Sequence, residues 1–579
     1  MKKRFLVTTA LEDYWPENGE SVIFLGEWCR LFSRKKIWEK MDAEVLPYHW
    51  DDRDKLHKDY KDICELFEKI LNELTIELNK IHSVNHSSRY WRILLGPWLI
   101  NFIPIIFDRF SCINNALLSS SIKAVIVSDR AVFDAIPFDM TNFAALQEDD
   151  LWNSDIYAMI IKLINFDGEV FRKTIKNNPI YSIKKPKILV LIKDLLGRVL
   201  TSFSSNNSIF IITPYIGRLL NFKLQLKLFQ FPSLFRSKRF DNEQPNSDFR
   251  EWKFENLNCD NEFEKILKEL IPLQMPTVYL EGYKKLCLNI TYANWPKNPK
   301  IIWTSNSFYL DDFFKLWAAE KVEFGTPLII GQHGGHYGQG LFSLPEYHEL
   351  QICDHYFSWG WKANSKVIPI GFLKQNSKLT KIKSLNTKAL LITSGAPRYS
   401  GTLMSIPIAG QVINYIDDQL EFYKSLTPDI SKSLIIRLYP YDYGWSQRER
   451  WKEAFPSSVI DNNKDFNKSI QDVNLVIAGW NSTTYLEVLA LDIPTVLFWK
   501  PNLFELNIDA AMLFEELKKV GIFHENPLSA AMHVMEIWDD IDVWWSNPDV
   551  VKAKNNFINT YVKPVDLINN LNIELRKLS

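Results

Sequence analysis

One stretch of the sequence, from Leu475 to Trp499, constrains the fold more than any other. Residues 475–478 form an apolar run with the length of a buried strand, and residues 495–499 form a second one. Between them apolar residues recur with helical spacing, and Asp492-Ile493-Pro494 ends that predicted helix. The order strand, turn, helix, strand is a βαβ unit, which predicts a parallel sheet.

The turn inside this unit contains Asn481, Ser482, Thr483 and Thr484. It lies at the carboxyl end of its strand and the amino end of its helix, where open α/β sheets bind ligands. Free backbone N–H groups, the helix dipole and three hydroxyls meet there, which suits a phosphate. The alternative is a plain N-cap, but one hydroxyl would be enough for that. We therefore predict a phosphate site.

Bulk properties limit the class of protein. A chain of 579 residues with 46% apolar residues is too long for one core, so two to four domains are expected. A net charge of -1 gives no indication of nucleic-acid binding. The six cysteines have no zinc-ligand spacing. They predict reduced thiols in a cytoplasmic protein, and we expect no metal.

The strongest candidate for a membrane span is residues 93–110. This segment contains Pro97, Asn101 and Pro104 and is shorter than a typical span. We expect a buried helical hairpin, or a helix on the membrane surface. The first residues, Met1 to Thr9, have too short an apolar run for a signal peptide and predict a strand.

A basic stretch runs from about residue 156 to 240. Apolar runs such as 188–192 and 209–212 alternate with its cations. One interpretation is a surface that holds the protein at an anionic bilayer, and the other is a solvated lysine face on a helical insertion. The cations are Lys173, Lys176, Lys184, Lys185, Lys187, Lys193, Arg198, Arg218, Lys223, Lys227, Arg236, Lys238 and Arg239.

Polar residues also follow predicted strands in the first part of the chain. Glu27 stands beside a glycine after an apolar run, and Asp51 follows His49 in a charged turn. Each carboxylate is either an acid/base group or a helix-capping residue, and we predict that His49 contacts substrate. His86 and Arg89 lie in a segment rich in side chains that bind sugars or phosphates, and we predict substrate contacts there rather than a two-histidine metal site.

A second informative loop follows the apolar run 327–330. It reads Gly-Gln-His-Gly-Gly-His-Tyr-Gly from residue 331 to 338. Glycines let a ligand approach the backbone closely, and a histidine between them at a strand's end is well placed for chemistry. We predict that His333 is catalytic. We expect substrate contacts from Gln332, Gly334 and Gly335.

The polar stretch 374–388 predicts a linker, after which a new α/β pattern begins at Ala389. Its first strand ends near Gly395 and Arg398. A later strand, residues 434–440, contains Arg437 and Tyr439. All four residues are predicted to bind the nucleotide, and the two guanidinium groups suit its phosphate. Glu487 is predicted to accept hydrogen bonds from the ribose hydroxyls.

Several of these motifs resemble those of known enzymes. Gly331–Gly334, Arg437–Pro440 and Asn481–Glu487 resemble the motifs of GT-B enzymes that transfer Kdo, sialic-acid-like or related nonulosonic sugars from CMP donors. In GT-B sialyltransferases a His-Pro pair and a Ser-Ser/Thr pair meet the donor's phosphate. Here Tyr439-Pro440 stands in place of His-Pro, which is a departure, whereas Ser482-Thr483 matches the second pair.

The first part of the chain resembles a family of bacterial transferases from surface-carbohydrate gene clusters, and this resemblance covers nearly the whole chain. It is carried by F-L-G-E-W-C (24–29), L-P-Y-H-W-D-D-R (46–53), V-N-H-S-S-R-Y-W-R-I-L-L-G-P-W (84–98) and F-D-R-F (107–110).

The resemblance implies a GT-B-like α/β fold, with two Rossmann-like domains facing a cleft. Residues 1–373 would be the acceptor domain, with a helical, basic insertion at about 150–300. Residues 374–388 would be the linker, residues 389–545 the nucleotide-sugar domain, and residues 546–579 C-terminal helices that fold back on the first domain.

The implied function is metal-independent transfer of an acidic nonulosonic sugar from a CMP donor to a bacterial surface glycan, without a cofactor. The acceptor is a glycan or a lipid-linked glycan, and the enzyme is expected in the cytoplasm, with peripheral contact to the inner face of the membrane. Three alternatives stay open: a UDP-sugar, GDP-sugar or CDP-glycerol transferase, a non-catalytic nucleotide- or carbohydrate-binding scaffold, and a sugar-nucleotide epimerase.

Overall fold

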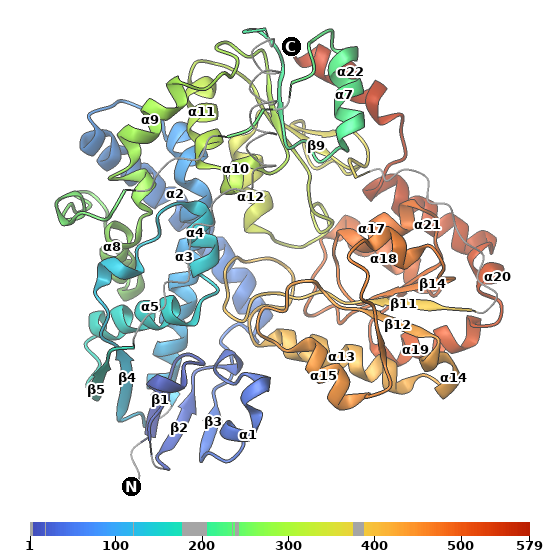
Figure 1. The fold of residues 1–579 in the computed structure, drawn as a ribbon, viewed down its shortest axis with the longest axis horizontal. Helices are drawn as coiled ribbons and strands as arrows, with labels where there is room; N and C mark the ends of the chain where they lie inside the picture. The colour runs from blue at the N-terminus through green and yellow to red at the C-terminus, as the bar shows by residue number, and fades with distance from the viewer. Residues whose placement is uncertain are drawn as a thin grey trace.

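The protein folds around three parallel β-sheets, as the computed structural model in Figure 1 shows. The structure describes residues 4–17, 19–119, 121–175, 205–233, 235–237, 243–374 and 387–579. The predicted α/β class is therefore confirmed. Part of the predicted basic stretch (Lys176, Lys184, Lys185, Lys187, Lys193, Arg198, Lys238 and Arg239) and most of the predicted linker 374–388 lie outside the described residues.

The first sheet has the strand order β3-β2-β1-β4-β5, and all of its pairings are parallel. The apolar run predicted at the start of the chain is β1, in the middle of this sheet. The strands are β1 (Arg4–Val7), β2 (Ser21–Phe24), β3 (Ala43–Val45), β4 (Ala124–Ser128) and β5 (Glu169–Lys173).

The second sheet has the order β10-β9-β8-β7-β6, again all parallel. Residues 1–373 thus contain two sheets, not the single one predicted, and the stretch 150–300 contributes β5 to one and β6 to the other. Strand β5 is exposed along its whole length and β6 has only three residues, so neither strand gives a clear apolar pattern in the sequence. The strands are β6 (Phe210–Ile212), β7 (Ile302–Thr304), β8 (Leu328–Gly331), β9 (His355–Ser358) and β10 (Val367–Pro369).

The third sheet, in the C-terminal half, has the order β13-β12-β11-β14-β15-β16. It contains the predicted βαβ unit as β14, α17 (Thr483–Ala490) and β15. Successive residues of β11 face two different apolar cores, one on each side of the sheet. The strands are β11 (Ala389–Ile392), β12 (Leu434–Arg437), β13 (Val459–Ile460), β14 (Leu475–Ala478), β15 (Thr495–Phe498) and β16 (Phe523–His524).

Two long helices form the centre of the N-terminal half. The periodicity predicted a helix over 56–81, and α2 spans Arg53–His82. The apolar segment 93–110 is not a hairpin but part of one helix, α3 (Ser88–Ser119), which continues through Pro97 and Pro104. Helix α3 contacts α5 beside the first sheet and α11 and α12 beside the second, so it joins the two sheets (Figure 1).

Helix α3 is long and apolar enough to cross a membrane by length and composition alone, but 89% of its most apolar window is buried inside the protein. Trp91 and Trp98 have no exposed surface. The apolar composition of α3 is thus explained by its position in the protein core.

The remaining helices cover the sheets. In the N-terminal half they are α1 (Lys35–Trp38), α4 (Met140–Leu146), α5 (Asp150–Leu163), α7 (Arg218–Lys227), α8 (Glu262–Gln274), α9 (Tyr283–Thr291), α10 (Ser307–Leu310), α11 (Asp312–Glu323) and α12 (Leu344–Ile352). In the C-terminal half they are α13 (Gln411–Ser425), α14 (Pro428–Lys432), α15 (Gln447–Ala454), α16 (Phe466–Ile470), α18 (Ile508–Lys519), α19 (Pro527–Ile537), α20 (Ile541–Trp545), α21 (Pro548–Tyr561) and α22 (Leu567–Leu578).

The end of the chain returns to the second sheet. The Lys563 N–H donates to the Trp359 carbonyl at 3.0 Å, and Asn570 Nδ2 donates to the Ile370 carbonyl at 2.8 Å. Helix α22 then packs against α7 (Figure 1). The C-terminal helices therefore tie the third sheet to the second.

The role of α3 as a core helix can be tested with two leucines of the same helix. Leu99 is fully buried, whereas the side chain of Leu118 is 79% exposed. We expect Leu99→Ala to lower the free energy of unfolding by about 2–5 kcal/mol, because it leaves a cavity, and Leu118→Ala to change it by less than about 0.5 kcal/mol. Chemical denaturation followed by circular dichroism measures both. Equal effects would contradict the buried position of α3.

Candidate functional site

The first loop of the candidate site follows β8, the middle strand of the second sheet. Gln332 fixes the start of this loop. Its Oε1 accepts hydrogen bonds from the Trp359 N–H at 2.8 Å and from Trp361 Nε1 at 2.9 Å, and its Nε2 donates to the Gly334 carbonyl at 2.8 Å. Gln332 is buried. It was predicted to contact substrate, but these bonds give it the role of holding the loop in shape.

The loop after β8 touches the loop after β14. A Cβ atom built on Gly335 would lie only 2.5 Å from the backbone nitrogen of Thr483, and closer still to the carbonyl of Ser482. No side chain fits in that space, so glycine at 335 allows the two backbones to meet. The two loops singled out in the sequence, more than 140 residues apart, are therefore in direct contact.

Hydrogen bonds fasten this contact on both sides. The Tyr485 hydroxyl of α17 donates to Gln339 Oε1 at 2.6 Å, and Gln339 Nε2 donates to the Gly335 carbonyl at 2.9 Å. Asn507 Nδ2 donates to the Gly338 carbonyl at 2.8 Å. The loop of the second sheet is thus built into the C-terminal half of the protein.

The start of α17 presents several polar groups. Ser482 is the N-cap residue, but its side chain makes no capping hydrogen bond. Ser482, Thr483 and Thr484 are half-buried, and their hydroxyls form no hydrogen bond within the part of the chain that the structure describes. The first N–H groups of a helix also lack partners inside the helix. Asn481 differs, because it is buried and its Oδ1 accepts from Tyr485 at 3.3 Å.

His333 lies at the same meeting point. A quarter of its side chain is exposed (25%), and its ring packs against Tyr215, Phe308 and Tyr337. Burial, with a smaller contribution from the positive charge of Lys374, lowers the pKa of His333 to about 4. The imidazole is therefore neutral at pH 7 and can accept a proton.

Two carboxyl groups of α12 contact the loop that carries this imidazole. Glu349 Oε1 is 3.9 Å from His333 Nδ1 and accepts a hydrogen bond from the Tyr337 hydroxyl at 2.6 Å. Burial raises the pKa of Glu349 well above its ordinary value, although Tyr337 and Tyr356 donate to it. Burial also raises the pKa of Glu346 to about 7, against the opposing effect of the Gly338 N–H, which donates to it.

Lys374 supplies a positive charge between the two loops. Its Nζ lies 3.2 Å from Glu487 Oε1 on α17 and 5.5 Å from the centre of the Tyr215 ring. Glu487, predicted to accept from a ribose, is thus paired with a lysine. Because Lys374 also lowers the pKa of His333, its positive charge acts on His333 as well as on Glu487 of α17.

The two arginines predicted to bind phosphate are engaged elsewhere. Arg398 donates to Asp150 Oδ2 at 2.7 Å and to the Trp28 carbonyl at 2.7 Å, so it links the C-terminal half to the first sheet. Arg437 donates to Asp461 Oδ2 at 2.5 Å and lies over the Phe466 ring. Both guanidinium groups therefore hold parts of the protein together.

Gly395 and Tyr439 remain at the predicted edge. They follow β11 and β12; β11 pairs with β14 on one side and with β12 on the other, all parallel, so the three carboxyl ends share one edge. Tyr439 is 39% exposed and stacks on Tyr443, and Gly395 lies against Gln447. These residues form the edge along which the start of α17 also lies, as expected for a ligand-binding edge.

The predicted acid/base residues Glu27 and Asp51 are both engaged in other contacts. Glu27 forms a two-pronged ion pair with Arg30 and packs on Gly410. Asp51 accepts from the Tyr48 N–H at 3.1 Å and from Gln411 Nε2 at 3.2 Å. Both carboxylates lie where the first sheet meets the C-terminal half, and neither is placed beside His333 by a contact.

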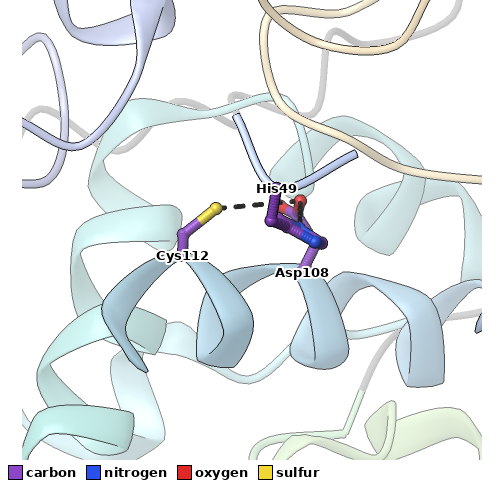
Figure 2. Close-up of side chains that lie close together, drawn as sticks. All are labelled: His49, Asp108 and Cys112. Carbon is purple, nitrogen blue, oxygen red and sulfur yellow. Dashed lines mark hydrogen bonds and ion pairs between the residues drawn. The ribbon is translucent and has the colours of Figure 1, made fainter. Parts of the chain in front are cut away.

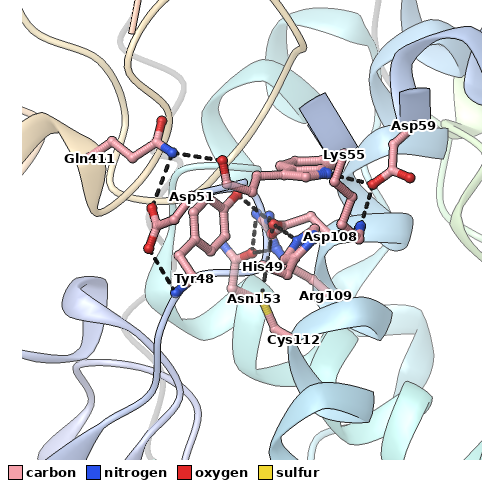
Figure 3. A network of polar contacts seen from close by, with 11 residues as sticks. Tyr48, His49, Asp51, Lys55, Asp59, Asp108, Arg109, Cys112, Asn153 and Gln411 are labelled. Carbon is pink, nitrogen blue, oxygen red and sulfur yellow. Dashed lines mark hydrogen bonds and ion pairs between the residues drawn. The ribbon is translucent and has the colours of Figure 1, made fainter. Parts of the chain in front are cut away.

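His49 belongs to a buried polar network around Asp108, shown in Figure 3. Asp108 accepts from the Tyr48 hydroxyl at 2.6 Å and from Arg109 at 2.5 Å, and it bonds His49 Nε2 at 3.0 Å. Lys55 approaches His49 Nδ1 from the other side, at 3.4 Å. His49 was predicted to contact substrate, but both of its nitrogens are used inside the protein.

His49, Asp108 and Cys112 have ligand atoms within 4.8 Å of one another, which is close enough to hold a metal ion (Figure 2). The chemistry of this set does not favour one. The guanidinium of Arg109 already pairs with Asp108, and the Tyr48 hydroxyl and His49 bond the same carboxylate, so its oxygens are bound within the protein. The cluster is explained as a hydrogen-bonded network.

His86 and Arg89 lie at the opposite edge of the second sheet from His333. Arg89 donates to Asp354 Oδ2 at 2.8 Å, just before β9 begins, and His86 contacts Glu323, before β8. His333 follows the other end of β8. His86 and Arg89 were predicted to contact substrate. In the structure they instead contact Glu323 and Asp354, which attaches the start of α3 to the second sheet.

Four residues of the site were not predicted from the sequence: Tyr337, Glu346, Glu349 and Lys374. Tyr337 was part of the loop motif but was not singled out. Glu346 stands three residues after Ser343, which caps α12, so its spacing fits an ordinary capping box. Glu349 and Lys374 carry no local signal, because only packing shows that they face His333.

Comparisons with known proteins place the chain in a broader context. Residues 4–575 match the model of a family described as LIC12162 family transferase. No curated protein matches the chain.

Two solved structures are similar at low identity. The crystal structure of Acinetobacter baumannii MurG has 10% identity and a TM-score of 0.32, with 64% of this chain and 99% of that chain covered. The spinosyn rhamnosyltransferase SpnG has 9% identity and a TM-score of 0.27, with 79% and 99% covered. Both likenesses are too distant to carry an argument.

The contact at Gly335 can be tested by adding one methyl group. We expect Gly335→Ala to lower the free energy of unfolding by about 1–3 kcal/mol, because the backbone of residues 482–483 leaves no room. Gly217→Ala is the control, since a Cβ there meets nothing within 4 Å, and we expect a change below about 0.5 kcal/mol. Denaturant unfolding measures both. A stable Gly335→Ala variant would show that the loops do not touch.

Proposed function

This chain belongs to the LIC12162 family of transferases, and from that premise we propose that it is a GT-B glycosyltransferase. It transfers an acidic nonulosonic sugar, such as Kdo or a sialic-acid-like sugar, from a CMP donor to a bacterial surface glycan. It needs no metal and no cofactor, and it works in the cytoplasm. The observation that carries the proposal is the contact of Gly335 with residues 482–483, which brings a neutral imidazole and an open helix start together.

The donor phosphate binds at the start of α17. Its ligands are the hydroxyls of Ser482, Thr483 and Thr484 and the first N–H groups of the helix, all without partners among the described residues. The nucleoside extends along the edge formed by Gly395 and Tyr439. Because a CMP donor carries a single phosphate, the charge to be neutralised is small.

Lys374 supplies the cation for an acidic donor. It pairs with Glu487 in the second turn of α17 and its charge acts on His333, so it can meet a sugar joined to that phosphate. Arg89, predicted from the sequence to contact substrate, lies at the opposite edge of the sheet. Lys374 reaches a carboxylate or a phosphate by exchanging its present partner, Glu487.

His333 acts as the general base. Its Nδ1 is buried on the side of Glu349, and its Nε2 makes a long contact of 3.4 Å with the Tyr337 hydroxyl, so an acceptor hydroxyl reaches Nε2 by replacing that contact. The acceptor oxygen forms a bond to the anomeric carbon while its proton moves to Nε2. The bond from that carbon to the phosphate oxygen breaks, and CMP leaves. Glu349 beside Nδ1 and the Tyr337 ring packed against the imidazole hold His333 in position.

The phosphate site gives a binding prediction. The double variant Ser482→Ala/Thr483→Val should weaken CMP binding roughly 10- to 100-fold, because two hydrogen bonds to a charged group are lost. Ser425→Ala removes an exposed hydroxyl at the far end of α13 and should change nothing. Titration calorimetry with CMP, UMP and GMP measures the affinities. Tight binding of UMP or GMP without CMP would reject the CMP donor, and no nucleotide binding at all would reject the transferase.

The base gives a kinetic prediction. His333→Gln should lower turnover about 10²- to 10⁴-fold while CMP affinity is kept, whereas His86→Ala, at the other sheet edge, should keep full activity. Loss of CMP affinity together with turnover in His333→Gln would show that the ring is structural.

The pKa of His333 sets the pH dependence. A base must be deprotonated, and with a pKa of about 4 the imidazole stays neutral as pH falls through 6.5. The rate should therefore decline only as pH approaches 4, rather than near 6.5. Lys374→Met removes a charge that lowers this pKa, so the acid limb should move to higher pH. Initial rates of donor consumption between pH 4 and 8 measure this, and an unmoved limb would exclude His333 as the titrating group.

A further inference from the structure

Helix α7 has two apolar faces, and only one of them is covered. Leu224 is fully buried in the apolar core, and α7 packs against α22. The other face is exposed to solvent: Leu219 is 79% exposed, Phe222 52%, Leu226 51% and Phe229, just after the helix, 86%. The spacing of these residues places them on one side of the helix.

The exposed face continues into a groove. The groove has a volume of about 560 Å³ and is lined by residues of α7 together with the loop 230–233. Most of its lining is apolar, with Phe231 and Pro232 opposite Phe222 and Leu226. Large exposed apolar patches of this kind mark interaction sites in soluble proteins.

Cations surround this face. Arg218, Lys223 and Lys227 are exposed and have no ion-pair partner among the described residues. Arg576 of α22 lies over the Phe229 ring, at 4.6 Å from its centre. The sequence from 205 to 237 contains no Asp or Glu. The patch is therefore apolar at its centre and positive at its rim, without compensating carboxylates in its own segment.

We propose that the α7 face, defined by Leu219, Phe222, Leu226 and Phe229 with its rim of cations, docks on an anionic bilayer. Apolar side chains enter the interface between headgroups and acyl chains, while neighbouring lysines and arginines meet the negative surface. A protein partner would need matching carboxylates and a fixed shape, whereas a bilayer needs only apolar area and negative charge. The long apolar helix α3 takes no part, because it is buried.

The α7 face lies next to the candidate active site in the chain. Tyr215 stands three residues before α7, its ring packs against His333, and Lys374 lies over it. Docking would therefore bring the loop after β8 close to the membrane, where a lipid-linked glycan is presented. This consequence rests on the proposed function, but docking itself does not.

Vesicle co-sedimentation of the full chain tests the docking. We expect the protein to pellet with vesicles containing phosphatidylglycerol, to pellet less as salt is raised, and to stay in solution with pure phosphatidylcholine. Phe222→Asp/Leu226→Asp should abolish pelleting. Lys223→Glu/Lys227→Glu should lower the partition coefficient by at least roughly fivefold for each cation removed.

The control variant is Leu528→Asp/Met532→Asp on α19. Leu528 is 52% exposed and Met532 60%, with the same spacing of four residues, so the change in the surface is matched. It should pellet like the unmodified chain. Circular dichroism and thermal unfolding confirm that each variant is folded.

Three outcomes would overturn the proposal. The first is an unmodified chain that does not distinguish anionic from neutral vesicles. The second is an α7 variant that pellets as well as the control. The third is concentration-dependent self-association, without vesicle binding, that Phe222→Asp/Leu226→Asp removes; this would make the face a contact between two copies. Nucleotide binding is measured separately, so a failure of docking is distinguishable from a failure of the transferase proposal.

Discussion

The close approach of Gly335 to the peptide between Ser482 and Thr483 is the constraint on which the candidate site depends. Two parallel sheets each end in a loop at the carboxyl edge, where α/β folds bind ligands. Alone, each loop offers half of a site: an imidazole in one and an open helix start in the other. A glycine without a side chain lets the backbones meet. The bond from Tyr485 to Gln339 then keeps them together.

Most of the strong charged interactions near the site hold the parts of the protein in place. Arg53 binds Glu505 with two hydrogen bonds, and Arg398 binds Asp150, so both connect the N-terminal half to the C-terminal half. Removing one partner of such a partly buried pair lowers the stability of the protein strongly, because the other charge is left without compensation. The groups to which we assign the proposed chemistry make few bonds within the protein: a neutral imidazole, a lysine and three hydroxyls.

The position of apolar residues, more than their number, separates core from interaction surface in this protein. Helix α3 is the longer and more apolar helix, yet it lies between two layers and shows almost nothing to solvent. Helix α7 is short and carries cations, yet one of its apolar faces is open. Hydropathy alone ranks α3 above α7, although α7 exposes more of its apolar side chains, because hydropathy does not record what covers each side chain.

The sequence by itself determined the elements that depend on near neighbours: the βαβ unit from β14 to β15, the helix α2, the α/β class, and the glycine and hydroxyl motifs of the two loops. These signals are local, since helical and strand periodicity and turn chemistry act over a few residues. Only the tertiary structure decided which motifs meet. The partner of Arg398 is Asp150, 248 residues away, and no local pattern predicts that a guanidinium beside a strand end is already bound. The same holds for Glu349 behind His333 and for the division of the N-terminal half into two sheets, because packing between distant segments fixes both.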